Sequence, residues 1–388
     1  TYADGADIIT ASAGTSNFRA GVNAGNSIQS GGNYNVCIGD EAGTAISTGD
    51  NNSAIGYGAL STLSTGSSNT AFGYNAMNAH TGLSNTAIGY GTLAASNSTN
   101  NSVAVGHSAL AVSTTGENVA VGASAMAASL GGTNNVAVGK GSMAANTTGN
   151  YNVAIGNSAM ATSQTVSGIT AIGRNALTAM TNGATYNTAV GFDCLKTSTA
   201  DSDNTAVGYN AGATIDGGID NTLIGAAVGA AITTGDYNTA VGSGALADAN
   251  TGYSNVAIGY DAGREITTGY KCVVIGDSCG SQADPQTGWE NIIIGWNSGY
   301  SLTSGNANVL IGVGSGYSLN NDENNIMIGY QSGYYHTGGP NTFVGRYAGR
   351  GTTGTASSLH NAAFGYNALQ AINQGDYNVA VGSYAADA

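Results

Sequence analysis

The stretch Asn85-Thr86-Ala87-Ile88-Gly89 recurs along the chain, for example as NVAIG at residues 255–259. Copies that end in an equivalent glycine occur 21 times between Gly39 and Gly382, and successive glycines lie 16 to 20 residues apart, most often 17. A fixed period near 20 residues is typical of stacked repeat architectures, in which each repeat packs on its neighbours. The repeat therefore predicts a solenoid, although 388 residues would otherwise suggest two or three globular domains.

The composition argues against several classes of partner. Eight Lys and Arg stand against 22 Asp and Glu, which gives a net charge of −14. Nucleic acids and anionic membrane surfaces are bound by clustered basic side chains, so we expect neither as a partner. No run of 18 apolar residues occurs, so we expect no membrane insertion. The four histidines have no repeated Ser or Asp partner, and we expect no enzyme activity.

Positions are counted here from the glycine that ends each copy, called the anchor glycine. Position −1 is Ile, Val or Phe in every copy. Position +4 is Leu or Met in 11 copies, all with Ala at −2, whereas all six copies with a large residue at −2 have Gly at +4. Because interiors are close-packed, two positions that exchange volume share one space, so −2 and +4 are predicted to touch in the core. A strand alternates its faces, so −1 is predicted to point the other way.

These patterns predict an all-β fold, a parallel β-solenoid of about 17 residues per coil and about 21 coils. Each circuit of ~56 Å is expected to hold two strands of four to six residues and two turns. The second apolar face needs a cover, and self-association with cyclic symmetry supplies one. The predicted assembly ladder at −1 includes Ile55, Ile88, Val105, Ile155, Ile172, Val207, Ile258, Ile294 and Ile311.

Position −4 is Asn in 18 of the 21 copies. Stacked Asn side chains can bond from coil to coil and satisfy turn backbone groups, so we expect a turn ladder here. Its predicted members include Asn52, Asn69, Asn85, Asn152, Asn204, Asn255 and Asn308.

Changes in repeat length fall between about +5 of one copy and −6 of the next, which predicts surface loops there. The candidate surface-binding residues in the longest loops are Gln282, Asp284, Pro285, Arg350, Thr352 and Thr353. Aromatic residues at +1 in consecutive copies, Tyr57, Tyr74 and Tyr90, are predicted to stack along the solenoid. An adhesive or glycan-binding stripe and a purely stabilising ladder are alternative interpretations of this pattern.

Residues 1–34 are predicted to be an N-terminal cap or the end of a preceding segment, with one degenerate coil at 17–21. The repeat domain is predicted to cover residues 35–388, with a change of repeat style near residue 206, after which Gly dominates at +4. The four Cys fit small buried positions, although Cys272 takes an Asn position and could pair with Cys279. We expect no cofactor; acidic clusters such as residues 40–41 could hold Ca²⁺, but solvated loop charge is the alternative interpretation.

The stretch NSVAVG at residues 101–106, followed by His107, Ser108 and Ala109, resembles the head repeat of YadA-like trimeric autotransporter adhesins. Similar repeats occur in trimeric phage tail fibres. The resemblance covers residues 17–388 and implies a left-handed β-roll in each chain, three of which assemble on the bacterial surface. The period is longer than in those heads, the Asn usually sits one residue later, and no neck, coiled-coil stalk or membrane anchor is recognisable.

The resulting hypothesis is an extracellular, homotrimeric fibre segment on a bacterial cell or a virion that attaches to a cell or surface by many weak contacts. A phage tail fibre that binds a host receptor and a subunit of an extracellular filament are the alternatives. An ice-binding solenoid is a minor alternative, based on Thr at −3 in Thr188, Thr205, Thr222 and Thr239. The receptor or glycan that such a fibre would bind is not encoded in any recognisable motif.

Overall fold

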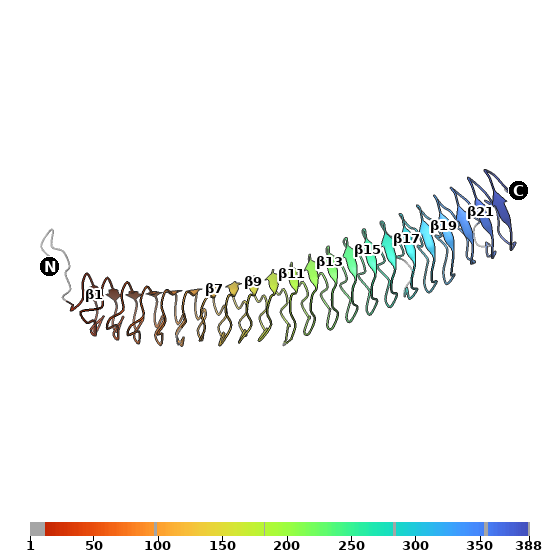
Figure 1. Cartoon of the computed structure of the whole chain (residues 1–388). Coiled ribbons are helices and arrows are strands. Elements are labelled where there is room, and N and C mark those ends of the chain that lie inside the picture. The colour runs from red at the N-terminus through yellow and green to blue at the C-terminus, as the bar shows by residue number, and fades with distance from the viewer. Residues whose placement is uncertain (1–11, 97–98, 182, 282–284, 353–355, 387–388) are drawn as a thin grey trace. The chain divides into compact units, whose positions relative to one another are not determined.

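The computed structural model describes residues 12–96, 99–181, 183–281, 285–352 and 356–386. The chain divides into two compact units, Thr1–Tyr186 and Asn187–Ala388. In each unit, every coil contributes one three-residue strand to a single row of parallel strands (Figure 1). The described residues contain 22 such strands and no helix, which confirms the predicted all-β parallel solenoid with coils about 17 residues long.

Every strand occupies positions −3 to −1 of its copy. The first unit contains β1 (Phe18–Ala20), β2 (Val36–Ile38), β3 (Ser53–Ile55), β4 (Thr70–Phe72), β5 (Thr86–Ile88), β6 (Val103–Val105), β7 (Val119–Val121), β8 (Val136–Val138), β9 (Val153–Ile155) and β10 (Thr170–Ile172). The second unit contains β11 (Thr188–Val190), β12 (Thr205–Val207), β13 (Thr222–Ile224), β14 (Thr239–Val241), β15 (Val256–Ile258), β16 (Val273–Ile275), β17 (Ile292–Ile294), β18 (Val309–Ile311), β19 (Ile326–Ile328), β20 (Thr342–Val344), β21 (Ala362–Phe364) and β22 (Val379–Val381).

Neighbouring strands pair in strict register, so that equal positions of successive copies lie side by side. The degenerate copy at residues 17–21 follows the same rule, because Phe18 of β1 pairs with Val36 of β2. The long loop between β16 and β17 leaves Val274 opposite Ile293. The length variation is therefore absorbed outside the strands, as the position of the insertions predicted.

The expectation of two strands per coil is wrong. Within the described residues each coil has one three-residue strand, and turns form its opposite side (Figure 1). Residues at +2 and +4 adopt positive φ, for example Asn75 and Met77 at 51°, and such residues cannot continue a strand. Backbone bonds between coils nevertheless persist on this side, where the Met77 N–H donates to the Thr92 carbonyl at 2.9 Å.

The anchor glycines stack in a column where successive backbones approach closely. Their φ angles lie between 119° at Gly39 and 147° at Gly191, a region that L side chains rarely adopt. A Cβ on Gly56 would also lie 2.5 Å from the carbonyl oxygen of Gly73. Both effects exclude any side chain, which explains why glycine ends every copy.

The core lies between the strand and the turns, and positions −2 and +4 share it as predicted. In the second unit a Cβ on Gly229 would lie 3.1 Å from the side chain of Leu223 in the same coil. A Cβ on Gly212, in the preceding coil, would lie 2.9 Å from the same leucine. Each −2 side chain therefore fills space left by the +4 residues of two coils.

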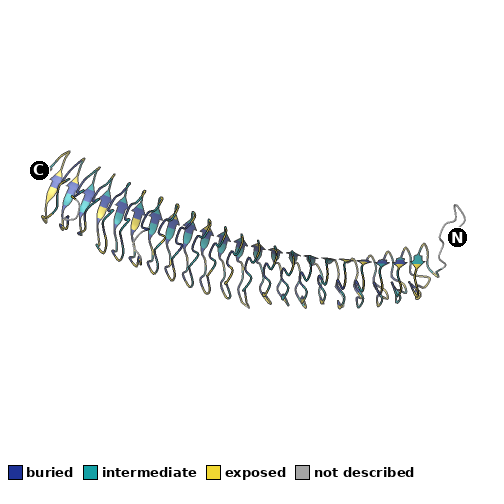
Figure 2. Ribbon diagram, turned by 180° about the vertical axis from the view of Figure 1, so that it is seen from behind, coloured by how far each residue is buried: buried dark blue, intermediate teal, exposed yellow. Residues whose placement is uncertain are grey.

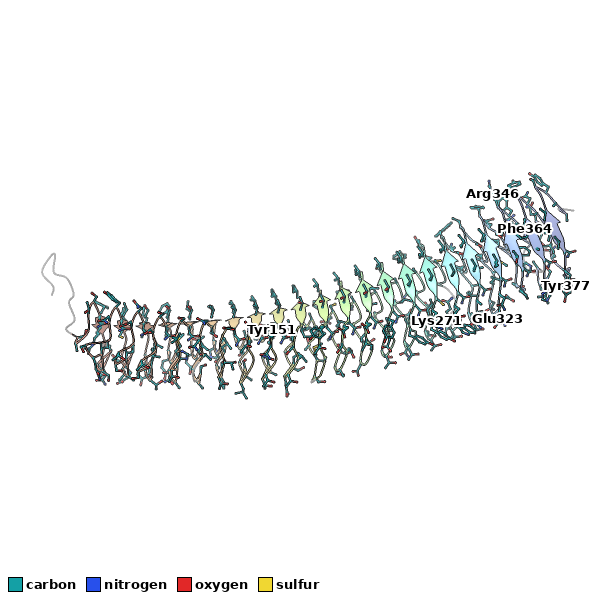
Figure 3. All side chains as sticks on the ribbon, viewed as in Figure 1. Tyr151, Lys271, Glu323, Arg346, Phe364 and Tyr377 are labelled. Atoms are coloured by element: carbon teal, nitrogen blue, oxygen red, sulfur yellow. The ribbon has the colours of Figure 1, made fainter. Side chains whose placement is uncertain are left out.

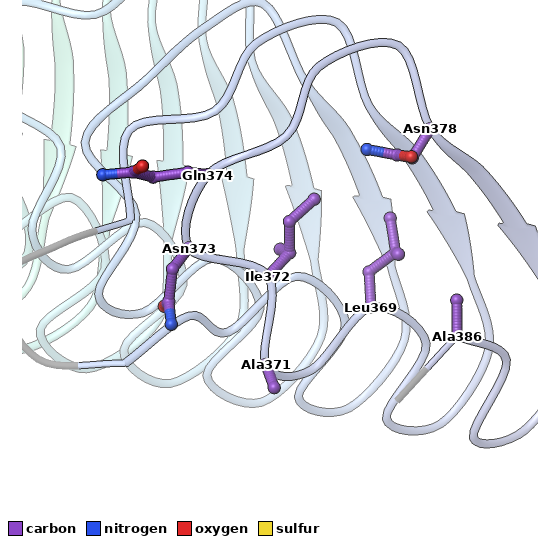
Figure 4. Close-up of a pocket in the computed structure, with 7 residues that line it drawn as sticks. All are labelled: Leu369, Ala371, Ile372, Asn373, Gln374, Asn378 and Ala386. Carbon is purple, nitrogen blue, oxygen red and sulfur yellow. The ribbon is translucent and has the colours of Figure 1, made fainter. Parts of the chain in front are cut away.

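A third interior position, +7, was missed in the sequence. It holds buried Ile215 and Ile232 in coils with Gly at +4. In coils with Leu or Met at +4 it holds either a buried serine, such as Ser96, or a large buried residue, such as Leu63 or Met180. The hollow of about 500 Å³ at the last described coils shows the same positions from the end (Figure 4). Leu369 at +4 lines this hollow, which is the interior of the coil stack and not a separate binding pocket.

Candidate functional site: an exposed apolar face and its flanking ladders

The outer face of the strand row is apolar and accessible. From β2 to β22 the middle residue of each strand is buried, and its two neighbours are half-buried or exposed (Figure 2). In the first unit the −1 column contains only Ile, Val and Phe over nine successive coils, from Ile38 to Ile172. At ~4.8 Å per strand this column is ~38 Å long. Contiguous apolar surface of this kind marks an interaction site on a soluble protein.

Every member of the predicted assembly ladder lies on this outer face, as expected from strand alternation. Ile88 and Ile155 each expose 38% of their surface. The exposed members are Ile88, Ile155, Ile172 and Ile258, and the half-buried members are Ile55, Val105, Val207, Ile294 and Ile311. In the single chain the ladder therefore remains partly accessible to solvent.

The −3 column flanks the ladder on the same face. Thr188, Thr205, Thr222 and Thr239 stand side by side in β11 to β14. The −3 column continues with Val256. The hydroxyl groups of the four threonines therefore form a short polar patch on an otherwise apolar face.

The asparagines at −4 lie inside the solenoid and bond from coil to coil. Asn52 Nδ2 donates to Asn35 Oδ1 at 3.1 Å and to the Gly66 carbonyl at 2.9 Å, and the Asn69 N–H donates to Asn52 Oδ1 at 3.0 Å. In all seven predicted members the backbone N–H donates to the side-chain Oδ1 of the asparagine in the preceding coil. These members are Asn52, Asn69, Asn85, Asn152, Asn204, Asn255 and Asn308. These buried amides hold the coils in register and are not available to a partner.

Cys272 and Cys279 do not form the possible disulfide. Both are free, buried thiols in the structure. Cys272 substitutes for an asparagine, and its backbone N–H still donates to Asn255 Oδ1 at 3.0 Å. The Cys279 thiol donates to the Ile293 carbonyl at 3.2 Å. Burial raises the pKa of the Cys279 thiol to about 12, so this residue behaves as a small core side chain.

The predicted aromatic stack at +1 is present. Ring centroids of Tyr57 and Tyr74 lie 5.3 Å apart, those of Tyr74 and Tyr90 lie 5.2 Å apart, and His107 extends the stack at 5.0 Å. The three tyrosines expose 52%, 47% and 55% of their surface. The rings therefore stabilise the stack of coils and still present their edges to solvent.

Two further aromatic stacks in the second unit were missed in the sequence. One lies at +5 and contains Tyr300, Tyr317 and Tyr334, with centroid distances of 4.8 and 4.6 Å. The other lies at −6 and begins with Tyr253 and Tyr270, 4.9 Å apart. Aromatic residues at equal offsets in consecutive copies were the available signal, because in-register coils bring equal offsets together.

The predicted surface-binding loops are only partly described. Three of their six candidate residues lie outside the described residues: Gln282, Asp284 and Thr353. Pro285 and Thr352 are exposed. Arg350 is half-buried, and its guanidinium carbon lies 5.4 Å from the ring centroid of Tyr335 and 5.2 Å from that of Tyr347. This arginine thus packs on aromatic rings of the solenoid.

The acidic side chains bond within the solenoid. Asp40 Oδ1 accepts a hydrogen bond from the Val22 N–H at 2.9 Å, and Glu41 Oε1 accepts one from Asn23 Nδ2 at 2.7 Å. Among the described residues no group of three or more His, Cys, Asp or Glu side chains is placed to hold a metal ion. The described part of the chain also has no helix with the length and apolarity needed to cross a bilayer.

No protein-family model matches this chain, and no curated protein matches it significantly. The functional conclusions therefore depend on the geometry of the coils and on the repeat itself.

Proposed function

We propose that this chain is a segment of an extracellular homotrimeric fibre that attaches to a cell or surface through many weak contacts. The observation that carries this proposal is the exposed apolar column at −1, which continues over nine successive coils in the first unit. Exposure of such a surface to water is unfavourable. Covering its Ile and Val side chains with a partner would gain about 25 cal/mol for each Å² of apolar surface removed from water.

Copies of the same chain are the partner that fits this face. The column repeats at every coil, so parallel copies in register place identical apolar residues against one another along their whole length. The outward face of each strand is only two side chains wide, at −3 and −1, and such a narrow strip suits packing around an axis. The resemblance to trimeric head repeats supports three copies as the number.

Such a fibre leaves its turns, loops and aromatic ladders for attachment. Many equivalent coils in one fibre give multivalent binding, in which weak contacts add through effective concentration. The net charge of −14 favours repulsion between separate fibres. The proposed location of the fibre is the surface of a bacterial cell or a virion.

The test is a double variant, Ile88→Asp with Ile155→Asp, examined by native mass and by circular dichroism. At a threefold axis each substitution brings three carboxylates together, so we expect dissociation with an unchanged β signature. The control is Leu83→Asp, because Leu83 is 49% exposed but lies on a turn away from the strand face. An assembly mass that survives the double variant would refute the proposed role of the −1 column.

A further inference from the structure

A notch interrupts the +1 column of the second unit. Trp296, Val313 and Tyr330 are the +1 residues of three successive coils, and the two aromatic residues expose 57% and 42% of their surface. In the first unit consecutive aromatic rings fill this column from Tyr57 to His107. Val313 leaves an opening of about 200 Å³ instead. Two coil spacings, ~9.6 Å, place the plane of one six-membered ring ~4.8 Å from each wall, close to the 4.8 Å that separates the stacked rings of Tyr300 and Tyr317.

A second aromatic surface closes one side of the notch. Gly314 has φ +61°, and a Cβ there would lie 2.9 Å from the ring of Tyr334. This glycine therefore allows the Tyr334 ring to lie against the backbone, where it also stacks on Tyr317 at 4.6 Å. Both tyrosines line the notch.

Two amide side chains supply polar groups to the same notch. Asn297 and Gln331, the +2 residues beside the walls, are half-buried and line the opening. Within the described part of the chain their side-chain amides form no hydrogen bond, so their donors and acceptors remain for a ligand. Aromatic faces that contact C–H groups, with a few amides that bond hydroxyl groups, are the requirements for holding a sugar ring.

A cation lies just beyond the Tyr330 wall of the notch. Arg346 is the next +1 residue after Tyr330, and its guanidinium carbon lies 5.3 Å from the Tyr330 ring centroid. Figure 3 places it on the edge of the strand row opposite Lys271 and Glu323. Lys271 pairs with Glu290, whereas Arg346 packs on tyrosine rings and keeps its charge exposed. In a chain with net charge −14, this exposed guanidinium favours an acidic ligand at this end.

We propose that this notch binds a pyranose that bears a carboxylate, with the ring between Trp296 and Tyr330 and the carboxylate extending past the edge of the Tyr330 ring toward Arg346. The inference rests on the attachment function proposed above and adds a ligand class to it. Binding of a single sugar is expected in the millimolar range, and the repeated chains of a fibre raise the apparent affinity.

The experiment uses the full chain with Trp289→Phe, so that Trp296 is the remaining one of the two tryptophans and reports through its fluorescence. The probes are methyl β-D-glucuronide and methyl β-D-glucoside, which differ only in the carboxylate. We expect the glucuronide to bind about tenfold more tightly, the factor given by one charge-assisted hydrogen bond. Arg346→Gln is expected to remove this preference. Equal binding of both probes, or no saturable binding of either, would overturn the proposal.

A second variant tests the notch by filling it with a side chain, so that no residue of its walls is removed. Val313→Tyr retains both walls and continues the column as Tyr57, Tyr74 and Tyr90 do, so it is expected to fold and to weaken glucuronide binding at least tenfold. Tyr260→Ala removes another exposed +1 ring outside the notch and is expected to have no effect. Loss of the assembly in Val313→Tyr would place the notch in the subunit contact and overturn this inference alone. If a monomeric chain binds the glucuronide, the proposed homotrimeric fibre is refuted and the proposed sugar site in the notch is retained.

Discussion

The exchange of volume between −2 and +4 predicts a specific rescue in the first unit. Leu60 is fully buried at +4, and Leu60→Gly removes a side chain whose truncation to Ala costs about 2–5 kcal/mol. Part of this loss is offset, because Leu60 has φ 52° and glycine relieves about 1–2 kcal/mol of left-handed strain. We therefore expect Leu60→Gly to destabilise its coil by up to about 4 kcal/mol.

Ala54→Leu should restore the packing. In the second unit Leu223 fits between Gly212 and Gly229, where an added Cβ would lie 2.9 and 3.1 Å from the leucine. The leucine introduced at position 54 would likewise lie between Gly43 of the preceding coil and the glycine introduced at position 60 of its own coil. Alone, Ala54→Leu overpacks against Leu60 and should cost about 1–3 kcal/mol. The double variant should fall within about 1 kcal/mol of the parent chain, because the two volume changes compensate.

Native-state hydrogen exchange of the coil that contains β3 (Ser53–Ile55) is the suitable assay, since a solenoid opens locally and global unfolding is not two-state. The control is Leu93→Gly with Ala87→Leu. Here Met77 of the preceding coil still faces position 87, so rescue should be incomplete. Additive effects of Leu60→Gly and Ala54→Leu, or equal rescue in both pairs, would refute the shared interior space.

Four other substitutions test the amide ladder, a buried histidine and the column of anchor glycines. Ser102→Asn should restore the amide ladder in its coil, because the Ser102 N–H already donates to Asn85 Oδ1 at 2.9 Å. The free energy of exchange protection of that coil should rise by about 1 kcal/mol. An unchanged value would contradict the proposed role of the ladder. Burial lowers the pKa of His336 from 6.5 to about 4, so the unfolded chain binds the proton more readily between these values. Stability is therefore complete above pH 6.5 and declines as the pH falls toward 4, and His336→Leu should flatten this melting-temperature profile. Gly139→Ala, with φ 132° and a Cβ 2.4 Å from a carbonyl oxygen, should cost more than about 3 kcal/mol of local stability in hydrogen exchange. Gly141→Asn, with φ 65° and open space, should be nearly neutral in the same measurement.

The strand row was predictable because equal positions stack. The buried −2 residue, the outward −1 residue and the stacked rings of Tyr57 and Tyr74 all follow from one period and one strand alternation, whereas the length of only three residues for the strand was not predicted. The opposite side of the coil was not predictable in the same way. Asn tolerates the left-handed conformation seen at Asn75, but Met77 and Leu60 have no such preference and adopt it only because core packing requires it.

The notch was beyond sequence reasoning for a different reason. Its residues come from three coils and from three offsets, +1, +2 and +5, and the sequence alone does not show that these offsets lie on one corner of the coil. The path of the turn determines this, and that path depends on the positive φ values at +2 and +4. The aromatic wall of Tyr334 depends in turn on the missing side chain of Gly314.

The central claim is that the exposed −1 column is covered by identical columns of two further chains. Sedimentation equilibrium of the whole chain at micromolar concentration measures this directly. The predicted result is a single species with three times the chain mass of 38.1 kDa, stable to dilution. A stable species with the mass of one chain would contradict it.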